Sequence, residues 1–233
     1  MKKLKLAGRR LEDILKSLPT KSEARPILPN GFEKCLRMRI AADACDTGFD
    51  SVLPMRYRAL STFHWTSVKV VYKISEFLGD CGQAKFIDIG SGVAKVCVAL
   101  SFLTDWEIFG LEQRTRLHEI GKSIVDENEI KRVHLINGNL IDLDWEGYDI
   151  FYFYNPFSEH TMPTNPLLID SSIELNPIFF KTYVDHVETR LKHLRAGTKL
   201  ITFHGFGGVI PDGWKVLFDT EIDSGSLTIH EKQ

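Results

Sequence analysis

FIDIGSGVA, residues 86–94, is the most informative segment of this 233-residue chain. It begins as a short apolar strand, passes through two glycines and continues as an apolar helix from about residue 93. This order is typical of open α/β sheets, in which a ligand binds at the carboxyl ends of the strands and glycines let backbone N–H groups approach it. A glycine turn also occurs without any ligand, so the surrounding sequence has to decide between the two interpretations.

The segments around this stretch alternate between apolar strands and helices. After a helix from Thr66 to Gly79, strands are predicted at 85–89, 106–112, 132–137, 148–154 and 198–204, with helices at 93–103, 114–128 and 177–194. This alternation indicates a parallel sheet covered on both faces. Segments 214–221 and 226–231 are so close that only an antiparallel hairpin can join them. The expected fold is an α/β three-layer sandwich whose mostly parallel, seven-stranded sheet ends in an antiparallel hairpin.

Residues 1–65 are predicted to form a helical N-terminal extension, and the main domain is predicted to span 66–233. Apolar residues at three- and four-residue spacing indicate an amphipathic helix that ends before Pro19. The proline-rich connector that follows leads to a short helix at 33–44. An irregular stretch through Asp46-Thr47-Gly48 and Pro54 is expected after it.

The composition is that of a globular protein. Hydrophobic residues make up 43% and charged residues 26% of the chain, which excludes a disordered chain. No uncharged stretch is long enough to cross a bilayer. Arg9, Arg10, Glu12 and Asp13 interrupt the apolar run that a secretory signal needs. A cytoplasmic protein that does not bind a membrane is therefore expected.

The cysteines give no sign of a metal site. No Cys-x-x-Cys pair is present, and no histidine stands at zinc-ligand spacing from Cys35, Cys45, Cys81 or Cys97. Reduced, partly buried thiols are favoured over a disulfide, and no metal is expected.

Basic residues are concentrated at the start of the chain. Residues 1–73 hold 15 lysines and arginines against 7 acidic residues, whereas the net charge of the whole chain is −2. A cationic face that packs on an acidic body is the favoured explanation, because charge runs are usually solvated faces. Recruitment of an anionic partner is the functional alternative.

Two acidic residues make the glycine turn more informative. Asp88 stands just before the turn, where an ionised acid suits a cationic or amino-bearing ligand better than a pyrophosphate. Lys95 occupies the third position of the dinucleotide pattern G-x-G-x-x-G/A, so the sequence does not match that pattern. Glu112 ends the second strand, and an acid there suits the vicinal hydroxyls of a ribose.

FIDIGSG (86–92) followed by FGLE (109–112) resembles the first two motifs of class I S-adenosylmethionine-dependent methyltransferases, and the resemblance extends over about residues 84–230. It implies S-adenosylmethionine as the cofactor and a sheet whose last strand is antiparallel. It also implies that the extension caps the cofactor site and that residues 66–233 bind the cofactor.

The resemblance assigns roles to individual residues. Asp88 and the loop Gly90-Ser91-Gly92 are expected to contact the methionine part of the cofactor. Glu112 is expected to bind the ribose, with Gln113 beside it as a further cofactor contact. Ala94 stands where many members have a third glycine, and tighter packing rather than lost binding is expected there.

Ile136-Asn137-Gly138-Asn139-Leu140 follows the third strand, where the family commonly has Gly-Asp to hold the adenine amino group. Asn139 replaces the acid, and its side-chain carbonyl is able to accept a hydrogen bond from that amine. Leu140 is expected to contact the cofactor beside it. A turn-forming role for Asn139 is an equally supported alternative.

Tyr154-Asn155-Pro156-Phe157 resembles the Asn/Asp-Pro-Pro-aromatic motif of methyltransferases that modify amino groups, with one proline instead of two. Methyl transfer from a sulfonium is an in-line displacement, so the protein mainly has to align a nitrogen lone pair. The Asn155 oxygen and a main-chain carbonyl suit its N–H groups, and Tyr154 and Phe157 suit a planar base or a cationic amine. These four residues are the expected catalytic residues. A plain strand stop, which Asn-Pro favours, is the alternative.

Residues 46–65 resemble a segment ahead of the cofactor motif in histone-lysine methyltransferases of the disruptor-of-telomeric-silencing type and in bacterial relatives. This resemblance implies that Tyr57, Thr62 and Trp65 line the methionine pocket. A packing segment with a partly buried tryptophan is the favoured alternative.

The sequence therefore favours an S-adenosylmethionine-dependent methyltransferase that acts on an amino nitrogen of a protein or small molecule. An RNA or nucleotide-base methyltransferase is one alternative, motivated by the basic start and the aromatic residues of the motif. A non-catalytic S-adenosylmethionine-binding module is the other, because Ala94 and Asn139 depart from the family pattern.

Overall fold

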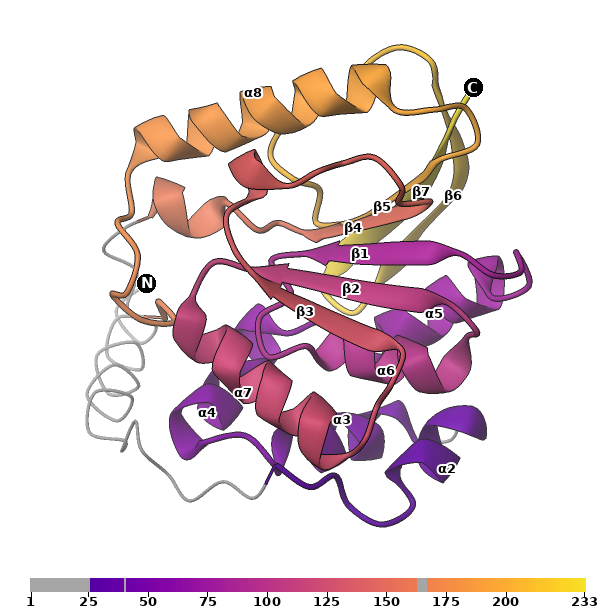
Figure 1. Ribbon diagram of the computed structural model, residues 1–233, viewed down its shortest axis with the longest axis vertical. Helices are drawn as coiled ribbons and strands as arrows, with labels where there is room; N and C mark the ends of the chain where they lie inside the picture. The colour runs from indigo at the N-terminus through magenta and orange to yellow at the C-terminus, as the bar shows by residue number, and fades with distance from the viewer. Residues whose placement is uncertain (1–25, 40, 163–166) are drawn as a thin grey trace.

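The computed structural model describes residues 26–39, 41–162 and 167–233. They form a seven-stranded sheet with helices on both faces (Figure 1). The amphipathic helix predicted before Pro19 lies outside the described residues. The strands are β1 (Lys85–Ile89), β2 (Glu107–Glu112), β3 (Val133–Asn137), β4 (Ile150–Tyr154), β5 (Lys199–Phe203), β6 (Trp214–Ile222) and β7 (Gly225–Lys232).

The strand order is β3-β2-β1-β4-β5-β7-β6. The first five strands of this order are parallel, and β7 runs antiparallel to both β5 and β6. The predicted fold, with its antiparallel hairpin at the end, is thus confirmed. Because β1 lies between β2 and β4, the carboxyl ends of these three strands meet at one edge of the sheet, which is where open α/β sheets bind ligands.

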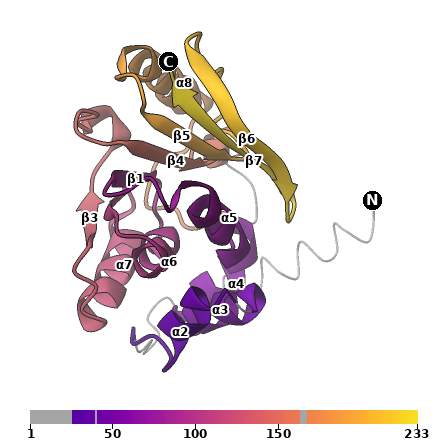
Figure 2. The same ribbon diagram turned by 90° about the vertical axis from the view of Figure 1, so that its right-hand side faces the viewer.

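The helices cover the two faces of the sheet separately. Helices α5 (Val68–Leu78), α6 (Lys95–Leu103) and α7 (Thr115–Glu127) lie on one face, and α8 (Pro177–His193) lies on the other (Figures 1 and 2). Alternate residues of a strand point to opposite faces. Within β1, Phe86 therefore belongs to the core under α5 and α6, and Ile87 belongs to the core under α8.

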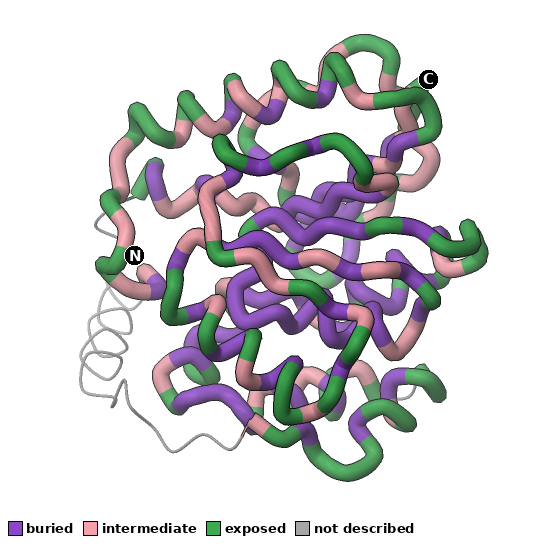
Figure 3. The backbone as a smooth tube through the Cα atoms, viewed as in Figure 1, coloured by how far each residue is buried: buried purple, intermediate pink, exposed green. Residues whose placement is uncertain are grey.

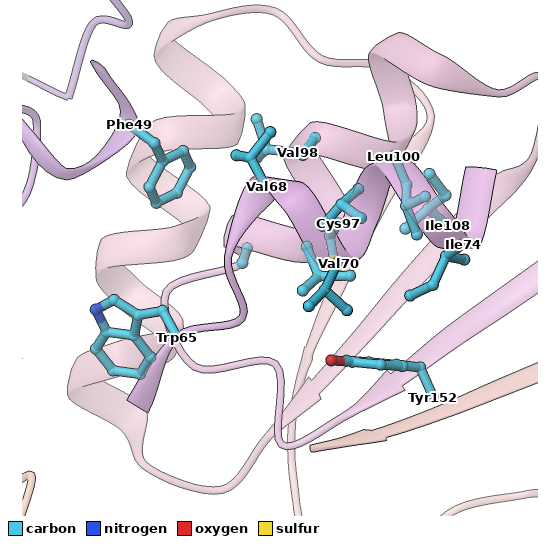
Figure 4. Packing of buried hydrophobic residues seen from close by; sticks show 14 of the residues in the cluster. Phe49, Trp65, Val68, Val70, Ile74, Cys97, Val98, Leu100, Ile108 and Tyr152 are labelled. Carbon is cyan, nitrogen blue, oxygen red and sulfur yellow. The ribbon is translucent and has the colours of Figure 1, made fainter. Parts of the chain in front are cut away.

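Buried residues are concentrated in the central strands and in the helices next to them (Figure 3). In the larger core, Tyr152 of β4 lies opposite Val70 of α5 and Cys97 of α6 (Figure 4). The Tyr152 hydroxyl is 2.7 Å from Thr66 Oγ1, so its only polar group is hydrogen-bonded inside an otherwise apolar region.

In the described residues, three short helices precede α5: α2 (Phe32–Arg37), α3 (Ala42–Asp50) and α4 (Met55–His64). The irregular stretch predicted after residue 44 is therefore wrong. Gly48 lies inside α3 and not in a turn, and an added Cβ would meet the Phe32 ring at 3.4 Å, an ordinary contact distance. Pro54 is the N-cap of α4, a position just before the helix where proline does not interrupt the backbone hydrogen bonds.

The prediction of four reduced thiols is also corrected. Cys35 of α2 and Cys45 of α3 form a disulfide. These helices fold back on each other, which the residue spacing alone does not reveal. Cys81 is free and exposed, and Cys97 is free and buried.

Candidate functional site

The glycine loop bends over the end of β2. The N–H groups of Gly90 and Ser91 both donate to the Leu111 carbonyl oxygen, at 2.9 Å. Gly90 and Gly92 have φ angles of 83° and 57°, in the left-handed region that glycine tolerates best. A Cβ at Gly92 would lie 2.8 Å from the Trp65 ring, so a side chain at this position has no room.

Ala94 takes the place of a third glycine at the end of this loop. It has a φ of 65°, and helix α6 begins only after it, at Lys95. The Ala94 methyl group is completely buried and faces α7, where a Cβ on Gly121 would lie 3.1 Å from it. The predicted tight packing is therefore present, and the absence of a side chain at Gly121 makes room for it.

Glu112 ends β2 beside the loop, and only 5% of its surface is exposed. Its Oε2 accepts from the Gly92 N–H and its Oε1 accepts from the Arg114 N–H, each at 2.8 Å. Burial raises the pKa of the Glu112 carboxyl, while these two hydrogen bonds oppose the rise. The carboxylate thereby ties the loop to the end of β2.

Asp88 lies behind the loop. Its side chain is on the face of β1 that it shares with Phe86, and it is 4% exposed. Cys97 Sγ lies 3.8 Å from its Oδ2. Burial, with the Glu112 charge as a smaller cause, raises the pKa of Asp88 to about 8. The structure thus places this predicted site residue outside the pocket described next.

A pocket opens at the carboxyl ends of β1, β2 and β4, as the sequence predicts for the ligand site. Ten of the predicted site residues line it: Trp65, Gly90, Gly92, Glu112, Gln113, Leu140, Tyr154, Asn155, Pro156 and Phe157. The other five predicted residues do not line it: Tyr57, Thr62, Asp88, Ser91 and Asn139.

The end of β4 is held in a constrained conformation. Asn155 has a φ of 38°, and its N–H donates to the Gly205 carbonyl at 3.0 Å. Pro156 packs on the glycine loop, where a Cβ at Gly90 would lie 3.1 Å from the proline Cβ. Phe157 stacks on Tyr183 of α8, with 5.2 Å between the ring centroids. Contacts with the glycine loop on one side and with α8 on the other therefore fix the predicted catalytic segment in place.

Asn139 and Gln113 form a polar network with Tyr183. Asn139 Nδ2 donates to the Tyr183 hydroxyl at 2.7 Å, and that hydroxyl donates to Gln113 Oε1 at 3.3 Å. Asn139 Oδ1 accepts from the Ile141 N–H at 3.0 Å, which is the turn-forming role considered from the sequence. The adenine-binding role of Asn139 stays a prediction.

Trp65 is buried with 8% of its surface exposed, and its Nε1 has no hydrogen-bond partner among the described residues. Tyr57 is buried away from the pocket, and Thr62 lies in a neighbouring groove that shares Tyr154 and Asn155 with the pocket.

Sequence reasoning missed an ion cluster at the pocket wall. The Arg114 side chain is 7% exposed, with its Nη2 2.6 Å from Glu159 Oε2 and its Nε 3.1 Å from Asp170 Oδ1. The cluster joins the end of β2 to the segment that follows β4. The partners lie 45 and 56 residues apart, so only the fold brings them together.

His64, at the end of α4, is a second residue that sequence reasoning missed. It lines the pocket, and its Nε2 lies 2.6 Å from the Leu167 carbonyl oxygen. In the described part of the chain, no cluster of His, Cys, Asp or Glu side chains is suited to hold a metal ion.

Comparison with known proteins supports the fold. No protein-family model and no curated protein matches the sequence. Similar solved structures include an RNA methyltransferase from Salinibacter ruber in complex with S-adenosyl-L-homocysteine (15% identity, 72% of this chain and 92% of that chain, TM-score 0.50). A methyltransferase from Pyrococcus furiosus is similar at 13% identity, over 72% of this chain and 83% of that chain, with a TM-score of 0.50. The chain has the fold of class I S-adenosylmethionine-dependent methyltransferases.

A further similar structure with this methyltransferase fold is the nicotianamine synthase MtNAS in complex with MTA and tNA. Its identity is 11%, over 100% of this chain and 97% of that chain, with a TM-score of 0.53. The likeness to lysine methyltransferases of the disruptor-of-telomeric-silencing type gains no support from the comparisons. None of the helices in the described residues is long and apolar enough to span a membrane.

Proposed function

We propose that this chain is an S-adenosylmethionine-dependent methyltransferase that methylates an amino nitrogen of a protein or a small molecule in the cytoplasm. One observation carries the proposal: the Glu112 carboxylate borders the same pocket as the glycine loop and the Asn155-Pro156 segment. An acid that suits a ribose and a segment that suits an amine therefore face one space.

The residues around the pocket fit this cofactor, which would supply an electrophilic methyl group on a positively charged sulfur. Beyond the two N–H groups that it holds, the Glu112 carboxylate has lone pairs left for the ribose hydroxyls. The buried Trp65 Nε1 is a donor without a partner among the described residues, and it suits the carboxylate of the methionine part. Gln113 and Leu140 line the same pocket and serve as further cofactor contacts.

The predicted residues outside the pocket lining receive supporting roles in this proposal. Ser91 holds the glycine loop on β2 through Leu111, and Asn139 holds the turn after β3 together with Tyr183. Asp88 lies behind the loop next to Cys97. The helices before residue 66 cap the cofactor site through Trp65, which packs on Gly92.

The acceptor nitrogen would lie beside Asn155. The side-chain oxygen of Asn155 accepts an N–H of the acceptor, and the rings of Tyr154 and Phe157 contact its planar or cationic group. This alignment of the nitrogen lone pair with the methyl carbon is the main contribution that a methyltransferase has to make.

Isothermal titration calorimetry with S-adenosylhomocysteine tests the cofactor site. Glu112→Gln places an NH₂ group against one of the two backbone N–H donors and removes the charge that attracts the ribose hydroxyls. We expect affinity to fall roughly tenfold or more, the usual cost of losing hydrogen bonds to a charged group. Glu119→Gln, on the exposed side of α7, is the matched control and should bind like the unchanged protein.

Product analysis after incubation with S-adenosylmethionine and a fractionated lysate tests the reaction. Release of S-adenosylhomocysteine together with a methylated amine supports the proposal, and methylated RNA bases would favour the nucleotide-base alternative. Release of methylthioadenosine would show that the aminocarboxypropyl group, and not the methyl group, is transferred from the sulfur. Binding without any transfer would indicate the non-catalytic module, and unchanged affinity of Glu112→Gln would contradict the assigned site.

A further inference from the structure

A second groove adjoins the proposed cofactor pocket. It shares four lining residues with that pocket: His64, Tyr154, Asn155 and Ser158. Thr62, Phe63, His204 and Ser224 complete its lining, and its volume is about 290 Å³. Because the shared residues include Asn155, the groove reaches the point at which the proposed methyl transfer takes place.

The groove lining is polar and aromatic, and it carries no formal charge unless one of its histidines is protonated. Its described lining residues include no Asp, Glu, Lys or Arg. The neighbouring carboxylate, Glu159, is already bound by Arg114 and by the Ile169 N–H at 3.0 Å. An alkylammonium would therefore lose its hydration here without gaining a carboxylate partner, which is costly.

The aromatic residues of the groove suit a planar group. Tyr154 and His204 are stacked, with 5.6 Å between their ring centroids and 28° between their planes. Phe63 is 47% exposed at the rim, and the Tyr154 hydroxyl donates to its carbonyl oxygen at 3.5 Å. Flat rings on an uncharged wall favour an uncharged ring that stacks and forms hydrogen bonds.

His64 lines this groove and has a ring nitrogen that can accept a proton. A carbonyl oxygen only accepts hydrogen bonds, so Nε2 carries the proton that bonds Leu167, and neutral His64 has its lone pair on Nδ1. No hydrogen-bond partner of Nδ1 is found in the described residues. Burial lowers the pKa of His64; of the charged neighbours, Glu159 opposes and Arg114 reinforces this effect. The other titratable groups around the groove are Tyr154 and His204.

We propose that this groove binds the methyl acceptor, that the acceptor is an uncharged planar nitrogen group on a heteroaromatic ring, and that His64 Nδ1 takes up its proton. This inference rests on the proposed function. The nitrogen lone pair forms a bond to the methyl carbon, and the carbon–sulfur bond breaks with its electron pair going to sulfur. The nitrogen, now positively charged, passes its proton to Nδ1, and the imidazolium then releases that proton to water.

The test measures S-adenosylhomocysteine release with imidazole, 2-aminopyridine, adenosine, an adenine-containing RNA oligonucleotide and butylamine as acceptors. We expect at least one planar acceptor to react ten times faster than butylamine. Free adenosine and the oligonucleotide distinguish a small-molecule source from RNA. Faster reaction of butylamine, or a lysate product methylated on an alkyl amine, would overturn the acceptor class while leaving the proposed methyltransferase intact.

His64→Gln tests the proton acceptor, because its side-chain NH₂ still donates to Leu167 while no basic nitrogen remains. We expect a fall in kcat of about a hundredfold or more, typical of losing a general base, and a much smaller change in the affinity for S-adenosylhomocysteine, because His64 also lines the cofactor pocket. The acid limb of the pH–rate profile, with its midpoint below 6.5 in the unchanged protein, should disappear. An unchanged kcat and pH profile would overturn the role of His64.

His193→Gln is the matched control, since this exposed residue at the end of α8 contacts only the Thr189 carbonyl among the described residues. It should keep the activity and the pH profile of the unchanged protein. If the unchanged protein neither binds S-adenosylhomocysteine nor transfers a methyl group, the proposed function itself fails, which is a different result from either outcome above.

Discussion

The ammonium group of Lys95 lies 2.7 Å from Asp46 Oδ1 and 3.1 Å from Asp50 Oδ1, with only 5% of the lysine side chain exposed. Lys95 is the first residue of α6, directly after the glycine loop, where a positive charge opposes the helix dipole. The two carboxylates lie one turn apart on α3 and offset that charge. They thereby fasten the N-terminal helices to the helix that follows the loop.

Replacing Lys95 by methionine should destabilise the protein by about 3 kcal/mol, because it leaves two largely buried carboxylates without their partner. Urea unfolding measures this change in the free energy of unfolding. Lys122→Met, which breaks an exposed pair with Asp126, should change stability by less than about 0.5 kcal/mol. Equal changes in the two variants would show that the buried cluster has no special role.

Asp88 should make a contribution to stability that decreases as pH rises from about 4 to 8. The pKa of Asp88 is about 8 in the folded protein against 3.8 for an unperturbed group. Within this window the folded state holds a proton that the unfolded state has released. This contribution to the free energy of unfolding therefore falls with rising pH, by at most about 1.4 kcal/mol per pH unit.

Asp88→Asn should flatten this dependence and should be more stable than the unchanged protein at pH 8, as measured by urea unfolding at pH 5, 6.5 and 8. Asp105→Asn, at a position whose side chain is 92% exposed, is the control and should keep the slope. A variant Asp88→Asn with an unaltered slope would refute the raised pKa.

Gly92→Ala should weaken binding of S-adenosylhomocysteine and lower stability. The new Cβ would lie 2.8 Å from the Trp65 ring, in addition to the strain of a φ of 57°. Gly82→Ala separates the two causes, because Gly82 has a φ of 80° but nothing within 4 Å of an added Cβ. We expect Gly92→Ala to melt at a clearly lower temperature than Gly82→Ala in thermal unfolding. Similar melting temperatures would mean that Trp65 moves aside freely.

Arg114→Gln should release the segment after β4 from the pocket wall, because the side chain holds both Glu159 and Asp170. Hydrogen–deuterium exchange should become faster at the amides of residues 158–162 and 167–170. Arg190→Gln, on the exposed surface of α8, should leave the exchange there unchanged. Unchanged exchange in Arg114→Gln would show that other contacts fix this segment.

The sequence predicts those residues of the candidate site that stand at the carboxyl end of a strand. Glu112 ends β2 and Asn155 directly follows β4, and parallel strands bring their carboxyl ends to one edge whatever the details of packing. Arg114 and Glu159 carry no such mark, because their pairing depends on the path of the segment after β4. Tyr183 likewise reaches the pocket from α8, and its position depends on how that helix packs.

Residue type alone does not fix where a side chain points, and the cofactor-binding role of Asp88 stays a prediction. Gly48 resembles a turn residue but lies inside helix α3. Asp88 resembles a ligand-facing acid, yet strand alternation directs it to the side of Phe86. Residue type indicated an acid near the ligand, and only the alternation of side chains shows that this acid lies behind the loop.

Because Ala94 and Gly121 lie so close together, the residue at one position limits which residues fit at the other. The methyl group at 94 occupies space that a methyl group at 121 would need, although the Val93 backbone and Leu135 also limit that space. A protein with Ala94→Gly should therefore partly tolerate Gly121→Ala, whereas a protein with alanine at both positions should be destabilised. Among descendants of a common ancestor, the two sites would be expected to covary. A search pattern that insists on three glycines in the loop would overlook every lineage that made this exchange.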